Sequence, residues 1–146
     1  MSAIPGQRTD PRIARTRAAV KGAATALFLE QGYTRTTMEE IAAAAGITKR
    51  TIYNHFVDKE ALFTFIVRDV TAFAGEFAEA LPARLEARQS GDDLLRALHE
   101  LARALAHAVL RPEVLGLRRL LIAEAREFPE LAREYFERAP GLVLSR

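Results

Sequence analysis

Hydrophobic residues recur at helical spacing along most of this chain, and residues that start or stop helices separate the segments that carry them. The first segment runs from about Pro11 to Gln31, with a proline suited to a first helical turn and Gly32 suited to the position just beyond the helix. We therefore predict a long helix here, which follows a flexible arm of residues 1–10. Its inward face carries apolar residues three, four or seven positions apart: Ile13, Val20, Ala24, Leu27 and Phe28.

Two short helices around a glycine are predicted next. Thr37 and Glu40 have the spacing of a capping box, in which each side chain bonds the main-chain N–H of the other residue. Gly46 permits a tight turn, and Thr48 is placed to cap the following helix. Two short helices joined in this way form a helix-turn-helix, here over residues 36–55. The apolar positions that face inward are Met38, Ile41, Ala42, Ala45, Ile47, Ile52 and Phe56.

The rest of the chain has the pattern of amphipathic helices. Asp58 is placed to cap a fourth helix that we expect to end at Leu81-Pro82, and three further helical segments are bounded at about 90–111, 112–128 and 129–140. The sequence contains no alternating strand pattern and no internal repeat. The predicted fold is all-α: a three-helix head with a helix-turn-helix, a long fourth helix and a helical bundle. The expected buried stripes are Leu62, Phe65, Ile66, Val70, Phe73 and Phe77, then Leu94, Leu98, Leu101, Leu105 and Val109, then Val114, Leu117, Leu120, Leu121 and Ala125, and finally Leu131, Tyr135 and Phe136.

Composition narrows the class of protein. Of the 146 residues, 49% are hydrophobic and 27% are charged, which is typical of a folded globular chain. No apolar run is long enough to span a membrane, and residues 1–22 lack the apolar core of a signal peptide, so we expect a cytoplasmic location. The absence of cysteine excludes disulfides, thiolate zinc sites and cysteine nucleophiles.

Charge is distributed unevenly between the two parts of the chain. Residues 1–57 contain eight Lys or Arg and four Asp or Glu, a net charge of +4. With 21 basic and 19 acidic residues in all, the remainder contains 13 and 15, a net charge of −2. A basic head on a mildly acidic body is typical of a protein that meets a polyanion at one end, although an excess of this size does not settle the matter alone.

The second short helix of the helix-turn-helix has the composition of a DNA recognition helix. The sequence has no acidic residue between Ile47 and Val57. A recognition helix needs this bias because its side chains reach base edges and phosphates in the major groove. Its outward residues are Lys49, Arg50, Thr51, Tyr53, Asn54 and His55.

This segment, TTMEEIAAAAGITKRTIYNHFVDK over residues 36–59, resembles the TetR family of repressors. The family shows a glycine, a small capping residue, a basic residue, a threonine, an apolar residue, Tyr-x-His-Phe and a Lys-Glu pair in this order. The resemblance extends from about Arg12 to Phe73 and continues weakly over residues 118–141. The matching residues are Gly46, Thr48, Lys49, Thr51, Ile52, Tyr53, His55, Phe56, Lys59 and Glu60.

The resemblance implies a homodimeric transcriptional repressor whose paired recognition helices enter successive major grooves of a palindromic operator in double-stranded DNA. A small-molecule effector in the helical body would alter the separation of these helices. Residues 11–57 would then form the DNA-binding domain and residues 58–146 a ligand-binding and dimerisation domain. Thr37, Tyr53, His55 and Lys59 would hold phosphates, Lys49, Arg50, Thr51 and Asn54 would face bases, and Thr48 completes the predicted DNA-binding set.

Arg50 departs from the family pattern, in which this position is more often small. An arginine can bind the O6 and N7 atoms of guanine together, which is worth about 1–3 kcal/mol of discrimination. We therefore interpret Arg50 as a candidate specificity residue. The alternative for Lys49 and Arg50 is that they only form a solvated surface. The alternative for Tyr53 and His55 is a buried aromatic residue and a surface histidine without a partner. Glu39 is expected to be solvated.

An enzymatic function is not expected. The sequence offers no nucleophile with a base, no metal cluster and no glycine-rich phosphate loop, so neither a metal nor a cofactor is predicted. The string that begins at His99 is a near miss to the zinc-protease pattern HExxH, but Arg103 stands at the second ligand position and a guanidinium does not coordinate zinc. The candidate effector-binding residues, for which packing is the alternative, are Phe65, Phe73, Phe77, His99 and His107.

The sequence leaves open whether the protein responds to an effector and how it dimerises. An architectural DNA-binding protein without an effector is the alternative function, although such a protein would carry more positive charge and apolar wedges. The resemblance also implies two more long helices that form the dimer interface, so we expect the chain to be incomplete at its C-terminal end or to dimerise differently. A fragment would expose apolar surface on the body helices and dimerise weakly.

Overall fold

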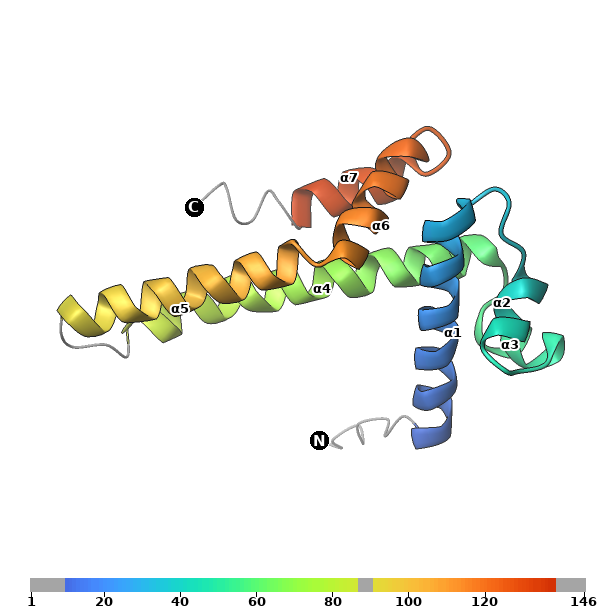
Figure 1. Ribbon diagram of the computed structural model, residues 1–146, viewed down its shortest axis with the longest axis horizontal. Coiled ribbons are helices and arrows are strands. Elements are labelled where there is room, and N and C mark those ends of the chain that lie inside the picture. The colour runs from blue at the N-terminus through green and yellow to red at the C-terminus, as the bar shows by residue number, and fades with distance from the viewer. Residues whose placement is uncertain (1–9, 87–90, 139–146) are drawn as a thin grey trace, which may run out of the picture. The chain divides into compact units, whose positions relative to one another are not determined.

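The computed structural model describes residues 10–86 and 91–138, apart from the side chains of residues 73–86, 91–93 and 108. The described residues form seven helices and no strand, which confirms the all-α prediction (Figure 1). The helices are α1 (Pro11–Gln31), α2 (Met38–Ala44), α3 (Lys49–His55), α4 (Lys59–Glu86), α5 (Gly91–Val109), α6 (Pro112–Ala123) and α7 (Pro129–Arg138).

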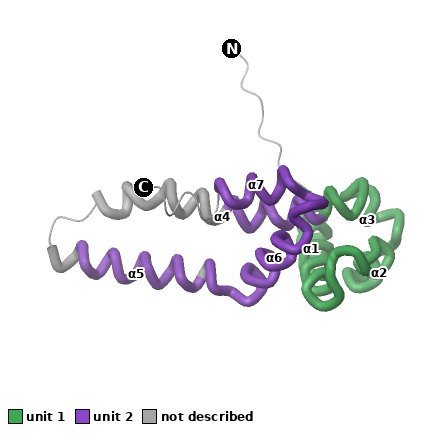
Figure 2. Tube along the Cα trace, turned by 90° about the horizontal axis from the view of Figure 1, so that it is seen from above, with its two compact units in different colours: residues 1–62 green, residues 63–146 purple. Residues whose placement is uncertain are grey.

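The chain divides into two compact units, residues 1–62 and residues 63–146 (Figure 2). The first unit contains α1, α2, α3 and the beginning of α4, and the second contains the remainder of α4 with α5, α6 and α7. No helix among the described residues is long and apolar enough to cross a membrane.

The core of the first unit lies where α2 packs against both α1 and α3 (Figure 1). Each helix contributes apolar side chains from one face, as the sequence pattern predicts. Ile13, in the first turn of α1, is an exception, with a side chain that is 41% exposed. The buried residues of this unit are Val20, Ala24, Phe28, Thr36, Met38, Ile41, Ala42, Ile52, Phe56 and, at the beginning of α4, Leu62.

The predicted capping box at the start of α2 is confirmed. The Glu40 carboxylate accepts hydrogen bonds from the N–H of Thr37 at 2.8 Å and from its hydroxyl at 2.9 Å, and the N–H of Glu40 donates to the Thr37 hydroxyl at 3.2 Å. Gln31 at the end of α1 also donates to this carboxylate, at 3.3 Å. The hydrogen bonds from Thr37, the main-chain one first, lower the pKa of Glu40 below its ordinary value.

The caps predicted for α3 and α4 are confirmed as well. The Thr48 hydroxyl accepts a hydrogen bond from the N–H of Thr51 at 3.2 Å, and the Asp58 carboxylate accepts one from the N–H of Ala61 at 2.7 Å. Gly46, between α2 and α3, has a φ of 69°, a conformation that favours glycine. These caps satisfy N–H groups that a helix cannot pair internally.

Lys59 ties the beginning of α4 to the segment between α1 and α2. Its ammonium donates to the carbonyl oxygens of Tyr33 at 2.9 Å and Thr36 at 2.8 Å, with that of Thr34 at 3.4 Å. The same ammonium lies 4.4 Å from the centroid of the Tyr33 ring. All three ammonium protons therefore have a main-chain partner inside the first unit.

Two predicted helix ends are wrong. Helix α4 passes through Pro82 and ends at Glu86. A proline costs a helix one hydrogen bond and some strain, and good helix formers on both sides of Pro82 sustain the helix in spite of that cost. Helix α6 ends at Ala123 rather than near residue 128, because Ala125 and Glu127 bond to carbonyls three residues earlier and form turns.

The buried faces in the second unit differ in part from the predicted stripes. In α4 the buried residues include Phe63 and Val67, whereas Phe65 and Val70 are half-buried. Phe73 and Phe77 lie on α4, but their side chains are outside the described residues. The other buried residues of this unit are Ile66, Thr71, Ala97, Leu117, Leu121, Phe128, Leu131, Ala132 and Tyr135.

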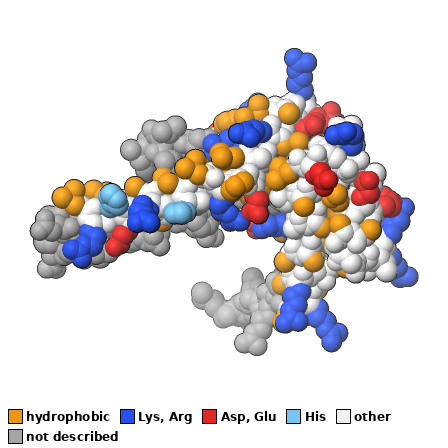
Figure 3. All heavy atoms as spheres, viewed as in Figure 1, with side chains coloured by type: hydrophobic (Ala, Val, Ile, Leu, Met, Phe, Trp, Pro, Cys, Tyr) orange, Lys and Arg blue, Asp and Glu red, His pale blue; other side chains and the backbone are white. Residues whose placement is uncertain are grey.

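Several apolar residues predicted to be buried are exposed. Leu94 and Leu98 on α5 are 40% and 43% exposed, and Phe136 on α7 is 45% exposed. Hydrophobic side chains are visible over α5 and over α6 and α7 in Figure 3. Leu95, Leu110 and Ile122 are also exposed.

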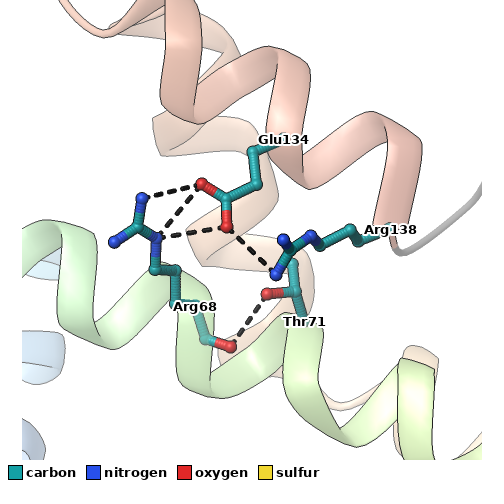
Figure 4. A network of polar contacts seen from close by, with 4 residues as sticks. All are labelled: Arg68, Thr71, Glu134 and Arg138. Carbon is teal, nitrogen blue, oxygen red and sulfur yellow. Dashed lines mark hydrogen bonds and ion pairs between the residues drawn. The ribbon is translucent and has the colours of Figure 1, made fainter.

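Charged and polar contacts hold α4, α6 and α7 together in the second unit. The Arg68 guanidinium on α4 donates to both carboxylate oxygens of Glu134 on α7, at 2.9 to 3.2 Å, and Arg138 lies 3.3 Å from the same carboxylate (Figure 4). Arg118 on α6 donates to the hydroxyl of the buried Tyr135 at 2.9 Å. A two-pronged arginine–carboxylate contact fixes the orientation of both side chains and so links α7 to α4.

We expect Lys59→Met to lower the free energy of unfolding of the first unit by about 1–2 kcal/mol, because it removes the charged donor from the carbonyls of the segment 33–36. Urea unfolding followed by circular dichroism, together with hydrogen exchange of the amides of residues 33–40, would measure the change. Arg50→Met is the matched control, since it removes the same charge from an exposed side chain that has no hydrogen bond within the described part of the chain. Equal stability of the two variants would contradict the role of Lys59.

We expect Glu40→Gln to remove the part of the free energy of unfolding that depends on ionisation of the Glu40 carboxyl. A carboxyl whose pKa is lower in the folded than in the unfolded protein stabilises the fold above the ordinary value of 4.5, and this contribution is lost as the pH falls through the lowered pKa. Glutamine still serves the capping box, so the fold is retained. The stability difference between wild type and variant should therefore shrink between pH 6 and about pH 3.

Thermal unfolding over that pH range would test the expectation. Glu60→Gln, which removes an exposed carboxylate from the first turn of α4, is the control. A difference between wild type and Glu40→Gln that stays constant across the range would argue against the lowered pKa.

Candidate nucleic-acid interface

Helix α3 separates its apolar and polar residues onto two faces. Ile52 is fully buried and Phe56, the residue after the helix, is 4% exposed, so both anchor α3 to the rest of the head. The outward face is free of acidic residues, as the sequence predicts. Of the residues predicted to contact DNA on this helix, Lys49, Arg50, Tyr53 and Asn54 are exposed, while Thr51 and His55 are half-buried.

Arg50, Tyr53 and Asn54 present polar groups that the head does not use. Among the described residues none of the three has a hydrogen bond, and Tyr53 is 41% exposed. Arg50 and Asn54 are four positions apart on one helix, so they lie on the same face. A guanidinium and an amide are the groups that most often bind guanine and adenine edges in the major groove.

The three threonine hydroxyls predicted near DNA already have partners in the head. The hydroxyls of Thr48 and Thr51 share a hydrogen bond of 2.8 Å, and the Thr37 hydroxyl donates to Glu40 at 2.9 Å. Lys59 is likewise engaged by main-chain carbonyls. All nine predicted residues therefore lie in the first unit. Some of their side chains are already hydrogen-bonded within the head, and others are not.

Lys49 is paired with Glu39 across the turn between α2 and α3. Its ammonium lies 2.5 Å from the Glu39 carboxylate, and the two side chains are 67% and 51% exposed. This hydrogen bond lowers the pKa of Glu39 and raises the pKa of Lys49. Glu39 is exposed, as expected, and in addition has this ion-pair partner, which could not be predicted because ten positions of sequence separation across a turn give no helical spacing.

The candidate effector-binding residues are not gathered by the described part of the second unit. Phe65 is half-buried on α4, and His99 and His107 are exposed on α5. Phe73 and Phe77 fall outside the described side chains, so the effector site stays a prediction. The residues that the structure describes contain no group of three or more His, Cys, Asp or Glu suited to a metal ion.

Two family models match the chain, one in each unit. Residues 22–64 match the model described as bacterial regulatory proteins, tetR family, and residues 96–146 match the model described as AefR-like transcriptional repressor, C-terminal domain. The first match covers α2, α3 and the turn between them. The second covers most of α5 with α6 and α7.

Relatives and solved structures agree with these matches. The regulator TcmR of Streptomyces glaucescens is 32% identical over 139 residues, which are 92% of this chain and 58% of TcmR. A TetR-family regulator from Mesorhizobium loti has a TM-score of 0.75 and 37% identity, covering 93% of this chain and 66% of that one. The flavonoid-responsive regulator FrrA has a TM-score of 0.58 and 35% identity, covering 87% and 61%.

This chain therefore spans between about a half and two thirds of the length of those proteins. The two family models nevertheless match both of its units, in the order in which the resemblance of residues 36–59 predicts them. The chain belongs to the TetR family of bacterial transcriptional regulators.

Proposed function

We propose that this protein is a DNA-binding transcriptional regulator that represses genes by occupying a palindromic operator as a homodimer and leaves it when a small-molecule effector binds the helical body. The observation that carries the proposal is the outward face of α3, which has no acidic residue and presents unpaired donors on a helix anchored by Ile52 and Phe56. Recognition helices of helix-turn-helix proteins have this division of faces.

Side chains that are hydrogen-bonded within the head and side chains that are not would contact DNA in different ways. Arg50 and Asn54 read base edges, with Lys49 and Thr51 beside them, and Tyr53 and His55 contact phosphates. The hydroxyls of Thr37 and Thr48 hold the caps, so these residues approach the phosphates from the ends of the two short helices. Lys59 contributes its charge to the head, since its protons are already donated to carbonyls.

Regulation by an effector and assembly as a dimer rest on the family rather than on a site in the described residues. The match of residues 96–146 to the C-terminal domain of a transcriptional repressor supports repression and a regulatory role for the second unit. FrrA is flavonoid-responsive, which supports a small organic effector as the class of ligand here. The exposed leucines of α5 supply apolar surface that a partner or a ligand can cover.

The test is a selection of duplexes from a random pool, followed by binding measurements at several salt concentrations. We expect Tyr53→Ala to weaken binding to every duplex to a similar extent, because a phosphate contact is lost, and to leave the salt dependence almost unchanged, because the tyrosine hydroxyl carries no charge. Arg50→Ala should lose about 1–3 kcal/mol of discrimination at one base pair, with a smaller effect on arbitrary DNA. Arg126→Ala, which removes an exposed charge after α6, is the control and should bind as wild type does.

If the pool yields no enriched sequence, and wild type binds all DNA as weakly as the two α3 variants do, the assignment of DNA recognition to α3 is wrong. An enriched sequence that Arg50→Ala binds with undiminished discrimination would leave DNA binding intact but remove Arg50 from base recognition.

A further inference from the structure

The carboxylate of Glu39 lies on the surface that the proposed function assigns to DNA. It reaches from α2 to the first residue of α3, where it holds the ammonium of Lys49 at 2.5 Å. The Lys49 ammonium also lies 5.9 Å from the centroid of the Tyr53 ring. A negative charge on α2 thus lies next to the face of α3 that is expected to meet a polyanion and that carries no acidic residue of its own.

Glu39 differs from its neighbour Glu40 in what it does for the fold. The Glu40 carboxylate accepts hydrogen bonds from Thr37 and Gln31 and closes the capping box. Among the described residues the only side chain that bonds the Glu39 carboxylate is that of Lys49, and both side chains are more than half exposed. An ion pair exposed to this degree contributes little to stability. Apart from its position in the first turn of α2, where a negative charge is modestly favourable, folding therefore gives a weak reason for a carboxylate at position 39.

The same ion pair opposes contact with nucleic acid. Lys49 is engaged in the free protein, so it must leave Glu39 before its ammonium can bind a phosphate or a base. Once Lys49 has turned to the DNA, the Glu39 carboxylate is left facing the phosphate backbone without its counter-charge. Both effects act on any sequence, because the charge of the DNA backbone does not depend on the bases.

We propose that Glu39 is a negative determinant of DNA binding, which holds Lys49 in the free protein and must release it when DNA is bound. This inference rests on the proposed function, since it requires that the outward face of α3 meets DNA. The ion pair lowers affinity for every duplex and so keeps the head from occupying arbitrary DNA at low salt. The residue thereby sets the strength of the sequence-independent part of binding.

The test compares Glu39→Gln with Glu40→Gln in the full chain, by fluorescence anisotropy on two duplexes of equal length. One duplex is the sequence enriched from the random pool, and the other has an arbitrary sequence. Both variants remove one negative charge from the first turn of α2, and glutamine preserves the capping box at position 40. Circular dichroism checks that both variants are folded.

We expect Glu39→Gln to bind both duplexes about three- to tenfold more tightly than wild type and to steepen the slope of log affinity against log salt by about 0.9, the value of one additional phosphate contact. Glu40→Gln should change affinity by less than about half of that effect, since its carboxylate is turned to Thr37 and Gln31. In a Lys49→Gln background the gain from Glu39→Gln should shrink, because no ammonium is left to release.

Each outcome decides between the two proposals. If wild type binds neither duplex, the proposed function fails and the inference fails with it. If wild type binds the enriched duplex but Glu39→Gln and Glu40→Gln behave alike, the proposed function stands and Glu39 is not a negative determinant. A gain from Glu39→Gln that is undiminished in the Lys49→Gln background overturns the release of Lys49 as its cause.

Discussion

The head of this protein depends on the packing of α2 against both α1 and α3. Helices α2 and α3 have seven residues each, which is far too short for a helix to be stable alone in water. They persist because Ile41 and Ile52 are fully buried and because capping residues satisfy the first N–H groups of both helices. Loss of either contribution would therefore affect both short helices together.

The contacts that stabilise the head also decide which polar side chains remain available on its surface. The hydroxyls of Thr37, Thr48 and Thr51 and the ammonium of Lys59 all hold parts of the head in place. The guanidinium of Arg50 and the amide of Asn54 do not. A helix this short has few outward residues. Neighbouring residues on its two turns therefore differ in role: some donors stabilise the fold, and others face outward.

In the second unit, the described parts of α4, α6 and α7 share buried apolar residues, among them Phe63, Leu121 and Tyr135, and polar contacts join the same helices. Arg68 and Glu134 join α4 to α7, and Arg118 reaches from α6 to the Tyr135 hydroxyl. The apolar face of α5, by contrast, is largely exposed at Leu94 and Leu98. Helical periodicity shows which face of α5 is apolar, but it does not show what covers that face.

The sequence by itself determined the features that arise within three or four residues of one another. The bounds of α1, the capping box of Thr37 and Glu40, the cap at Thr48 and the turn at Gly46 all follow from local hydrogen bonds and backbone preferences. The acid-free face of α3 and the family motif likewise follow from the sequence alone.

Only the tertiary structure decided the contacts between residues far apart in the chain. Lys59 meets Tyr33 across 26 residues and Arg68 meets Glu134 across 66, while Lys49 meets Glu39 across a turn. Such pairs depend on how the helices pack, and periodicity within one helix carries no information about its neighbour. The continuation of α4 through Pro82 could not be predicted from the sequence either. The lost hydrogen bond and the strain at a proline end a helix only when no other interaction offsets them.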